Sequence, residues 1–305
     1  MMSWRGLFLC LWLGSACLGV AQERGLRGLP EKKWDELSDR NVKAMGRAAL
    51  LIRPGDWKHA ETENFVYHFF NGALSTPASI EAEFYLRFLL KELGKTADAM
   101  RGKAHIFLFD KDEDWAAFRH LGQLDPWTGG VHSEGELFCT RKPGAALSNR
   151  TLGHEMTHLA FFRIHQRSLP LWLEEGYAEY VSIRSYASYH RARGFRAAPV
   201  SRALSDGSLI PLAELTALTA YPVETDARIV VFYGQSEKLV RFLAKTDKPA
   251  MLSMIDKLGK GDGFEGALRS AFGARFMSIA DLEKEFRVYA TKDFGSSFQN
   301  TTDED

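Results

Sequence analysis

Two stretches of the chain indicate its chemistry and its fold: HEMTH at residues 154–158 and LPLWLEEGYAEYV at residues 169–181. In the first stretch, His154 and His158 stand at positions i and i+4, so on a helix they lie on one face about one turn apart. Two imidazoles placed in this way can bind one tetrahedral zinc ion through their ring nitrogens. Glu155 points away from that face and can reach a water on the open position of the metal, as a general base must.

The second stretch offers a third ligand, which a catalytic zinc site needs beside its open position. Glu175 lies 17 residues after His158, enough for a short loop and a helix that returns along the first. Glu175 and Glu179 again stand at i and i+4. We therefore expect Glu175 on the metal and Glu179 accepting a hydrogen bond from a ligand histidine, which fixes the tautomer of that histidine. Glu174 is the rival ligand, but it points about 100° away from Glu175 and has no i+4 partner.

The mixed histidine and carboxylate donors favour zinc over other divalent metals, so the expected cofactor is one Zn²⁺ ion. A different interpretation of the second helix is a solvated acidic face with its apolar residues in the core. The HEMTH motif favours the ligand interpretation, because two carboxylates on one face beside an apolar helix are then explained as ligand and support.

HEMTH followed by LPLWLEEGYAEY resembles the gluzincin zinc metallopeptidases, in particular the small exported peptidase MA-like group, which carries HExxH and then a P-x-W-L-x-E-G-x-A-x-Y helix. The resemblance is specific over residues 152–180 and looser over about 63–242. It implies that Glu175 is the third zinc ligand. It also implies that Tyr233, on a later helix, is the phenol that stabilises the oxyanion in gluzincin aminopeptidases, although a packed aromatic is the other interpretation of this residue.

One departure from the aminopeptidases concerns their G-A-M-E-N strand, whose glutamate holds the free amino terminus of the substrate. The best match here is GGVHS at residues 129–133, with His132 in place of that glutamate. Glu134 and Glu136 are candidates to replace it. The loss of the amine anchor favours an endopeptidase, with the strand binding an extended substrate backbone. The residues expected to contact that backbone are Gly130, Val131 and His132.

The period of the apolar residues changes along the chain. Strand-like runs at 64–70, 104–109 and 129–140 and helical spacing at 31–51, 79–93 and 110–121 predict an α+β lobe. Helical spacing follows at 149–165, 171–186, 229–245, 250–257 and 279–290. We expect an α+β, zincin-like metallopeptidase with its edge strand over the cleft, a mainly helical C-terminal lobe and the zinc between the lobes.

The first residues have the features of a secretory signal: Arg5, an apolar run at 7–13 and a small-x-small site at 19–21. The run is shorter than the roughly 20 residues that span a bilayer. We expect export to the periplasm or outside the cell, or a lipid anchor on Cys17 if that cysteine ends a lipoprotein signal. The expected regions are a signal peptide (1–21), an N-terminal extension (22–58), a peptidase domain (59–295, divided into 59–145 and 146–295) and a polar tail (296–305).

Composition limits the partners. The chain has 305 residues, and its 39 Lys and Arg balance its 39 Asp and Glu, so there is no basic excess to indicate nucleic-acid binding. After removal of the signal, Cys139 is the one remaining cysteine, and we interpret it as a buried small hydrophobe. The histidines outside the motif lack the spacing of metal ligands and are interpreted as ordinary core or surface residues.

These observations predict zinc-dependent hydrolysis of peptide bonds in a peptide or protein substrate, with contact to a membrane only through a lipid on Cys17. Two alternatives stay open. One is an exported zinc-binding scaffold with a vestigial site, and the other is a metal-dependent amidase that acts on cell-wall material. The presence of Glu155 argues against the scaffold, because a structural zinc site needs no general base.

Overall fold

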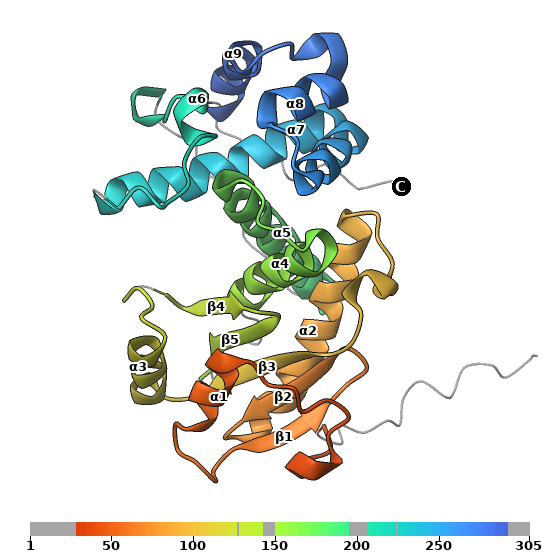
Figure 1. Cartoon of the computed structure of the whole chain (residues 1–305), viewed down its shortest axis with the longest axis vertical. Coiled ribbons are helices and arrows are strands. Elements are labelled where there is room, and N and C mark those ends of the chain that lie inside the picture. The colour runs from red at the N-terminus through yellow and green to blue at the C-terminus, as the bar shows by residue number, and fades with distance from the viewer. Residues whose placement is uncertain (1–28, 127, 143–149, 195–205, 224, 292–305) are drawn as a thin grey trace, which may run out of the picture.

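A five-stranded mixed sheet forms the N-terminal part of the protein and helices form most of the rest, as the computed structural model shows (Figure 1). This arrangement confirms the predicted α+β class. The predicted signal peptide and polar tail, and the boundary placed after residue 145, lie outside the described residues. The structure describes residues 29–126, 128–142, 150–194, 206–223 and 225–291.

The sheet has the strand order β1-β2-β3-β5-β4. Its two inner pairs, β2 with β3 and β3 with β5, are parallel, and its two outer pairs are antiparallel. The prediction of a strand at 104–109 is confirmed, and the run predicted at 129–140 is the hairpin of β4 and β5. The strands are β1 (Lys58–Glu61), β2 (Phe65–Phe69), β3 (Ala104–Phe109), β4 (Gly130–Ser133) and β5 (Glu136–Thr140).

Helices cover both faces of the sheet. The helices of the described residues are α1 (Ala44–Leu50), α2 (Gly72–Glu92), α3 (Asp112–Leu121), α4 (Arg150–His165), α5 (Leu171–Ala192), α6 (Leu212–Leu215), α7 (Asp226–Lys260), α8 (Phe264–Phe272) and α9 (Ile279–Ala290), of which α1 to α4 pack against the sheet. Within the described ranges, no helix is long and apolar enough to cross a membrane. Ile106 and Leu108 of β3 belong to the core that includes residues of α2 and α4, whereas Phe107 and Phe109 pack in a second core with residues of α1 and α3. The central strand is therefore buried on both sides.

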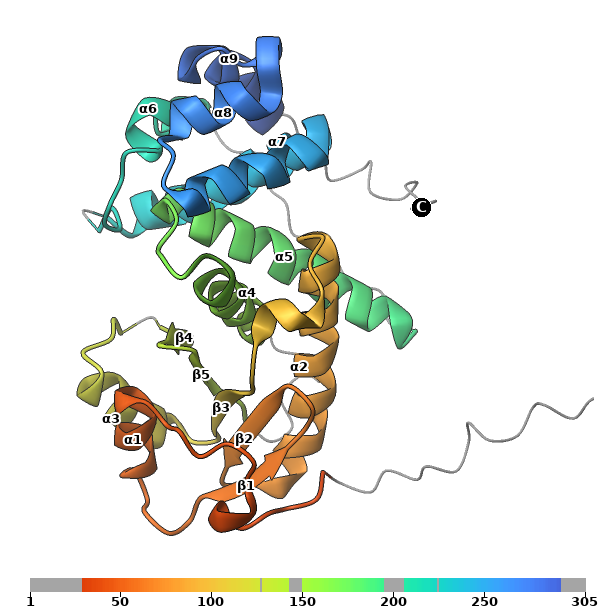
Figure 2. The same ribbon diagram turned by 45° about the vertical axis from the view of Figure 1, so that its right-hand side comes forward.

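The helical part is organised around α5, which packs against α4 on one side and α7 on another (Figures 1 and 2). Gly176 of α5 allows α7 to approach closely, since a Cβ at this position would lie 2.4 Å from the carbonyl oxygen of Ser236. A side chain there would force the two helices apart. The residue before it, Glu175, is therefore held at a set distance from the backbone of α7.

The helix predicted over residues 31–51 is wrong. Only a short 3-10 turn and α1 form there, because backbone groups in this segment bond to the sheet instead. Glu136 of β5 accepts the N–H groups of Lys43 (2.7 Å) and Gly46 (3.0 Å), and so fixes where α1 begins. The spacing of apolar residues over 31–51 could not predict these bonds, because Glu136 is far away in sequence.

Other helix boundaries also differ from the prediction. The helix expected at 79–93 begins at Gly72, because the Asn71 side chain caps it. Helix α5 continues to Ala192. The two helices predicted in the region of α7 correspond to its halves, since the backbone of Asp247 is extended and its carboxylate caps the second half. Helices α6 and α8 were not predicted.

Three buried histidines form a hydrogen-bonded row across β1, β2 and β3. His59 Nδ1 lies 2.9 Å from His68 Nδ1, and His68 Nε2 lies 2.8 Å from His105 Nδ1. Asp39 Oδ1 lies 3.7 Å from His105 Nε2 and favours a hydrogen on that nitrogen, so every bond of the row points toward Asp39. The sequence interpretation missed this row because its members come from three strands.

This row predicts acid sensitivity. Burial lowers the pKa of His59, His68 and His105, so the folded protein keeps them neutral where the unfolded chain, with pKa values near 6.5, takes up protons. Stability is therefore lost as the pH falls below about 6.5, by up to about 1.4 kcal/mol per pH unit for each histidine.

Urea unfolding between pH 7.5 and pH 5 measures this slope. His68→Asn removes one titrating group and is expected to make the slope shallower by up to about 1.4 kcal/mol per pH unit. The exposed His120→Asn, which removes an imidazole outside the row, is the matched control. An equal slope in wild type and His68→Asn would contradict the assignment.

Candidate metal centre

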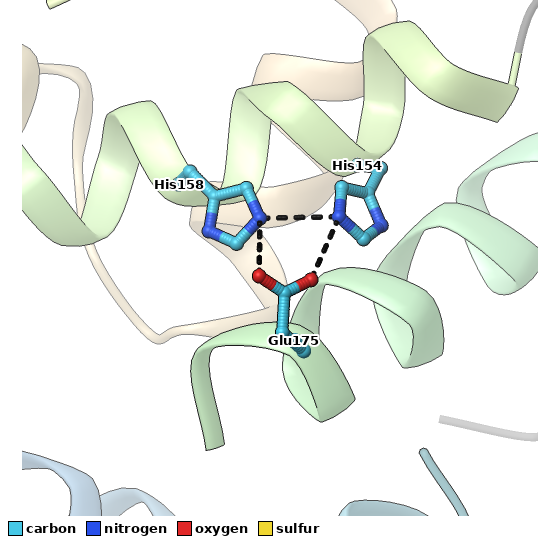
Figure 3. Close-up of side chains that lie close together, drawn as sticks. All are labelled: His154, His158 and Glu175. Carbon is cyan, nitrogen blue, oxygen red and sulfur yellow. Dashed lines mark hydrogen bonds and ion pairs between the residues drawn. The ribbon is translucent and has the colours of Figure 1, made fainter. Parts of the chain in front are cut away.

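The predicted metal ligands converge where α4 meets α5 (Figure 3). The Nε2 atoms of His154 and His158, one turn apart on α4, are 3.1 Å apart. Glu175 of α5 faces both, with Oε2 3.2 Å from His154 Nε2 and Oε1 3.7 Å from His158 Nε2. One ligand atom from each residue lies within 4.8 Å of the other two. The three side chains form a candidate metal site.

The donors at this site fit a divalent metal ion. Two imidazoles and one carboxylate can hold a tetrahedral zinc and leave one position open. The Glu175 side chain is only 5% exposed, and its Oε2 atom is buried without a hydrogen-bond partner among the described residues. Lone pairs of imidazole and carboxylate that face a common point repel one another unless a cation or protons lie between them. A cation at this point would relieve that repulsion.

Glu179 makes the contact that its i+4 position predicts. Its Oε1 lies 3.0 Å from His154 Nδ1, and its Oε2 accepts a hydrogen bond from Arg150 at 2.7 Å. In its neutral form, His154 with its hydrogen on Nδ1 would direct the Nε2 lone pair at Glu175 and His158. Glu179 thereby selects the tautomer that a metal ligand needs.

The carboxylates and histidines of the site stabilise each other's charged forms. Burial opposes the charged forms, yet the neighbouring carboxylates of Glu175 and Glu179 hold the pKa of His154 well above its ordinary value. The pKa of His158 is also raised against burial, through Glu175. In turn, the two histidines hold the pKa of Glu175 well below its ordinary value, again against burial. The Glu175 carboxylate therefore stays ionised and stabilises positive charge beside it.

Glu155 lies in the same cleft, on another face of α4. Burial raises the pKa of its carboxyl, which also accepts the backbone N–H of His132. Gly130 lets β4 lie directly on α4, because a Cβ there would be 2.4 Å from Thr151 Cγ2 and 3.2 Å from Glu155 Cγ. The backbone of β4 therefore passes over this carboxylate.

A cleft of about 800 Å³ brings the predicted site residues together. It is lined by β4 and the loop before it, by α4 and α5, and by two tyrosines from the α7 region. The predicted residues that line it are Gly130, Val131, His132, His154, Glu155, His158, Glu175, Glu179 and Tyr233.

Tyr221 is a residue of this cleft that sequence reasoning missed. Its hydroxyl donates to Glu175 Oε1 at 2.6 Å, and its ring stacks on Tyr233 with centroids 6.1 Å apart. Burial raises the pKa of both phenols, so both stay protonated and able to donate. Tyr221 lies in the loop between α6 and α7, outside any helical spacing, and no sequence signal connects it with the site.

The candidates to replace the amine anchor do not reach the cleft. Glu136 is buried and caps α1, as described above. Glu134 lies at the exposed turn between β4 and β5, with a φ of 48°, and does not line the cleft. His132 does line it, but its Nε2 accepts the N–H of Gly135 at 3.2 Å, and burial lowers its pKa to about 3. The side chain of His132 is therefore neutral.

Cys139 is buried in β5, as predicted for a small hydrophobe. Burial raises the pKa of its thiol to about 12, so the thiolate needed for nucleophilic attack does not form at neutral pH. The groups of the cleft that could take part in chemistry are therefore the candidate metal ligands, Glu155 and the two phenols.

No protein-family model and no curated protein matches the chain. The case for function therefore rests on the motif residues and on the geometry of the cleft.

The neighbouring carboxylates of α5 provide a matched test of the metal site. Glu175→Gln removes the charged ligand and is expected to reduce zinc affinity more than the roughly 10- to 100-fold that loss of a supporting hydrogen bond causes. Glu174→Gln alters a carboxylate that accepts the N–H of Leu169 and is expected to retain zinc. Metal content after dialysis, measured by atomic spectroscopy, checks both. Equal zinc in the two variants would exclude Glu175 as a ligand.

Proposed function

We propose that the protein is a zinc-dependent peptidase of the gluzincin type, acting as an endopeptidase on extended polypeptides. The placement of Glu155 beside the cluster of His154, His158 and Glu175, beneath the strand β4, supports this most strongly. The α+β part and the helical part would then form the two zincin-like lobes, with the zinc between them.

The residues of the cleft divide the chemistry among them. When bound, zinc would polarise the scissile carbonyl and lower the pKa of a water molecule. Glu155 takes a proton from that water as its oxygen attacks the carbonyl carbon, and gives the proton to the leaving amine when the C–N bond breaks. The raised pKa of Glu155 suits a group that must both accept and return a proton. Tyr233 donates a hydrogen bond to the carbonyl oxygen as negative charge develops on it.

The sheet supplies a binding edge for the substrate. β4 is the last strand in the sheet order, and in the described part of the chain no strand pairs with its outer edge. An extended polypeptide can add to such an edge through backbone hydrogen bonds. Because the candidate acidic anchors point elsewhere, the free amino terminus of a substrate finds no carboxylate on this strand, which favours cleavage within a chain.

A scaffold with a vestigial site accounts less well for the same residues. A structural zinc site closes its coordination with four protein ligands, whereas three are brought together among the residues that the structure describes. The cost of burying the Glu155 carboxyl next to Glu175 is hard to explain without a role in proton transfer.

We also propose that the protein is exported, on the evidence of the signal-like residues 1–21 alone. A peptidase in that compartment would meet unfolded exported polypeptides as its substrates. Amino-terminal sequencing of the mature protein tests this: a start at Gln22 indicates signal cleavage, and a blocked start at Cys17 indicates a lipid anchor.

Glu155→Gln is the central test of the peptidase. The variant is expected to keep zinc, because the side chain is not a ligand, and to lose about 100- to 10,000-fold in kcat/KM on unfolded casein. Glu134→Gln, at the exposed turn, is the control and should retain activity. Hydrolysis of casein by Glu155→Gln at the wild-type rate would refute the proposed mechanism. Cleavage of peptidoglycan in place of casein by the wild type would support the amidase alternative.

The cleft also predicts a side-chain preference. Phe162 lines it, is 46% exposed and lies against the neutral ring of His132, with centroids 5.3 Å apart. An exposed aromatic in a binding cleft favours a large apolar side chain next to the cleaved bond. Phe162→Ser is expected to lower kcat/KM for such peptides by about 10- to 100-fold, but much less for peptides with small side chains there. Equal losses for both peptide sets would contradict the preference.

A further inference from the structure

Tyr221 makes the shortest described polar contact to the candidate metal ligands. Its hydroxyl lies 2.6 Å from Oε1 of Glu175, a distance typical of a phenol that donates to an ionised carboxylate. The other oxygen, Oε2, has no hydrogen-bond partner among the described residues and lies 3.2 Å from His154 Nε2. The two oxygens of one carboxylate thus have different surroundings.

We propose that Tyr221 is a positioning residue for the metal centre, which holds Glu175 so that Oε2 faces the metal and Oε1 is occupied by the phenol. The inference rests on the metal-binding part of the proposed function, and not on peptidase activity. A carboxylate held in this way would offer one oxygen to a metal ion, which would leave room for a water molecule at the site.

The ring of Tyr221 is held in place by α7. It stacks on Tyr233, with planes inclined by 21°, and meets Phe232 edge to face, with centroids 6.0 Å apart. Helix α7 is in turn held against α5 by the close approach at Gly176, next to Glu175. The donor and its acceptor are therefore fixed relative to each other through one packed contact, so the hydrogen bond requires little further ordering of the loop.

The hydrogen bond from Tyr221 to Glu175 gives the two tyrosines different roles. A phenol has one proton to donate, and that of Tyr221 is given to Glu175. The hydroxyl of Tyr233 is hydrogen-bonded to that of Tyr221, whereas the described contact to Glu175 comes from Tyr221. We therefore assign Tyr233 as the phenol that donates to the substrate. Loss of the Tyr221 hydroxyl would leave Oε1 of a buried carboxylate unpaired and free to turn toward the metal.

The matched variants Tyr221→Phe and Tyr233→Phe test this division in the full chain. We expect Tyr221→Phe to weaken zinc binding by about 10- to 100-fold, the usual effect of losing a partner that orients a ligand. Tyr233→Phe is expected to change zinc affinity by less than about twofold. Competition with a chromophoric chelator measures both affinities, and thermal unfolding of the zinc-free proteins shows whether the variants remain folded.

Replacement of zinc by Co²⁺ supplies a second readout that does not depend on stability. If Glu175 turns and binds through both oxygens in Tyr221→Phe, the visible absorption of Co²⁺ falls, as expected for a change from four to five ligands. The Tyr233→Phe spectrum is expected to match that of the wild type.

Wild-type zinc affinity and an unchanged Co²⁺ spectrum in a folded Tyr221→Phe would overturn the inference. A wild type that binds no zinc would overturn both the inference and the proposed function. If the wild type binds zinc but cleaves no peptide, while Tyr221→Phe still weakens zinc, the inference stands and the proposed peptidase function fails.

Discussion

The attraction between one buried carboxylate and two imidazoles is the interaction on which the cleft depends. Glu175 can remain ionised in the interior because His154 and His158 face it, and the histidines can accept positive charge because Glu175 faces them. Each member alone would be expensive to bury. Two further residues support these charged groups: Glu179 contacts Nδ1 of His154, and the Tyr221 hydroxyl donates to Glu175. The packing of α4, α5 and α7 serves to keep these groups within contact distance.

The residues of the site that lie on one helix or one helical hairpin could be predicted from the sequence. The i, i+4 pairs of α4 and α5 were predictable because helical spacing places both members of a pair on the same face. Tyr233 could be assigned through the family resemblance alone. Tyr221 could not be found, because the fold of the loop before α7, and not any periodicity, brings its hydroxyl to Glu175.

The fold, like the site, could be predicted only where the signal is local in the sequence. The apolar run of β3 predicted its bounds, since a strand buried on both faces has a continuous apolar sequence. The short polar strand β1 and the irregular segment before α1 were not predicted. Strand β1 has few apolar residues of its own to predict it and forms by pairing with β2. The N–H groups at the start of α1 bond to Glu136, which is far away in sequence. The histidine row is a further example, because it exists only after three strands are aligned in register.

The position of β4 at the margin of the sheet has a consequence for the protein as a molecule in a crowded compartment. An open row of N–H and C=O groups does not distinguish a substrate from the strand of another folded protein, and exposed edges of this kind promote aggregation. Here the edge is only four residues long and lies against α4 at Gly130. A short edge covered in this way offers little length for pairing with the edge of another folded sheet.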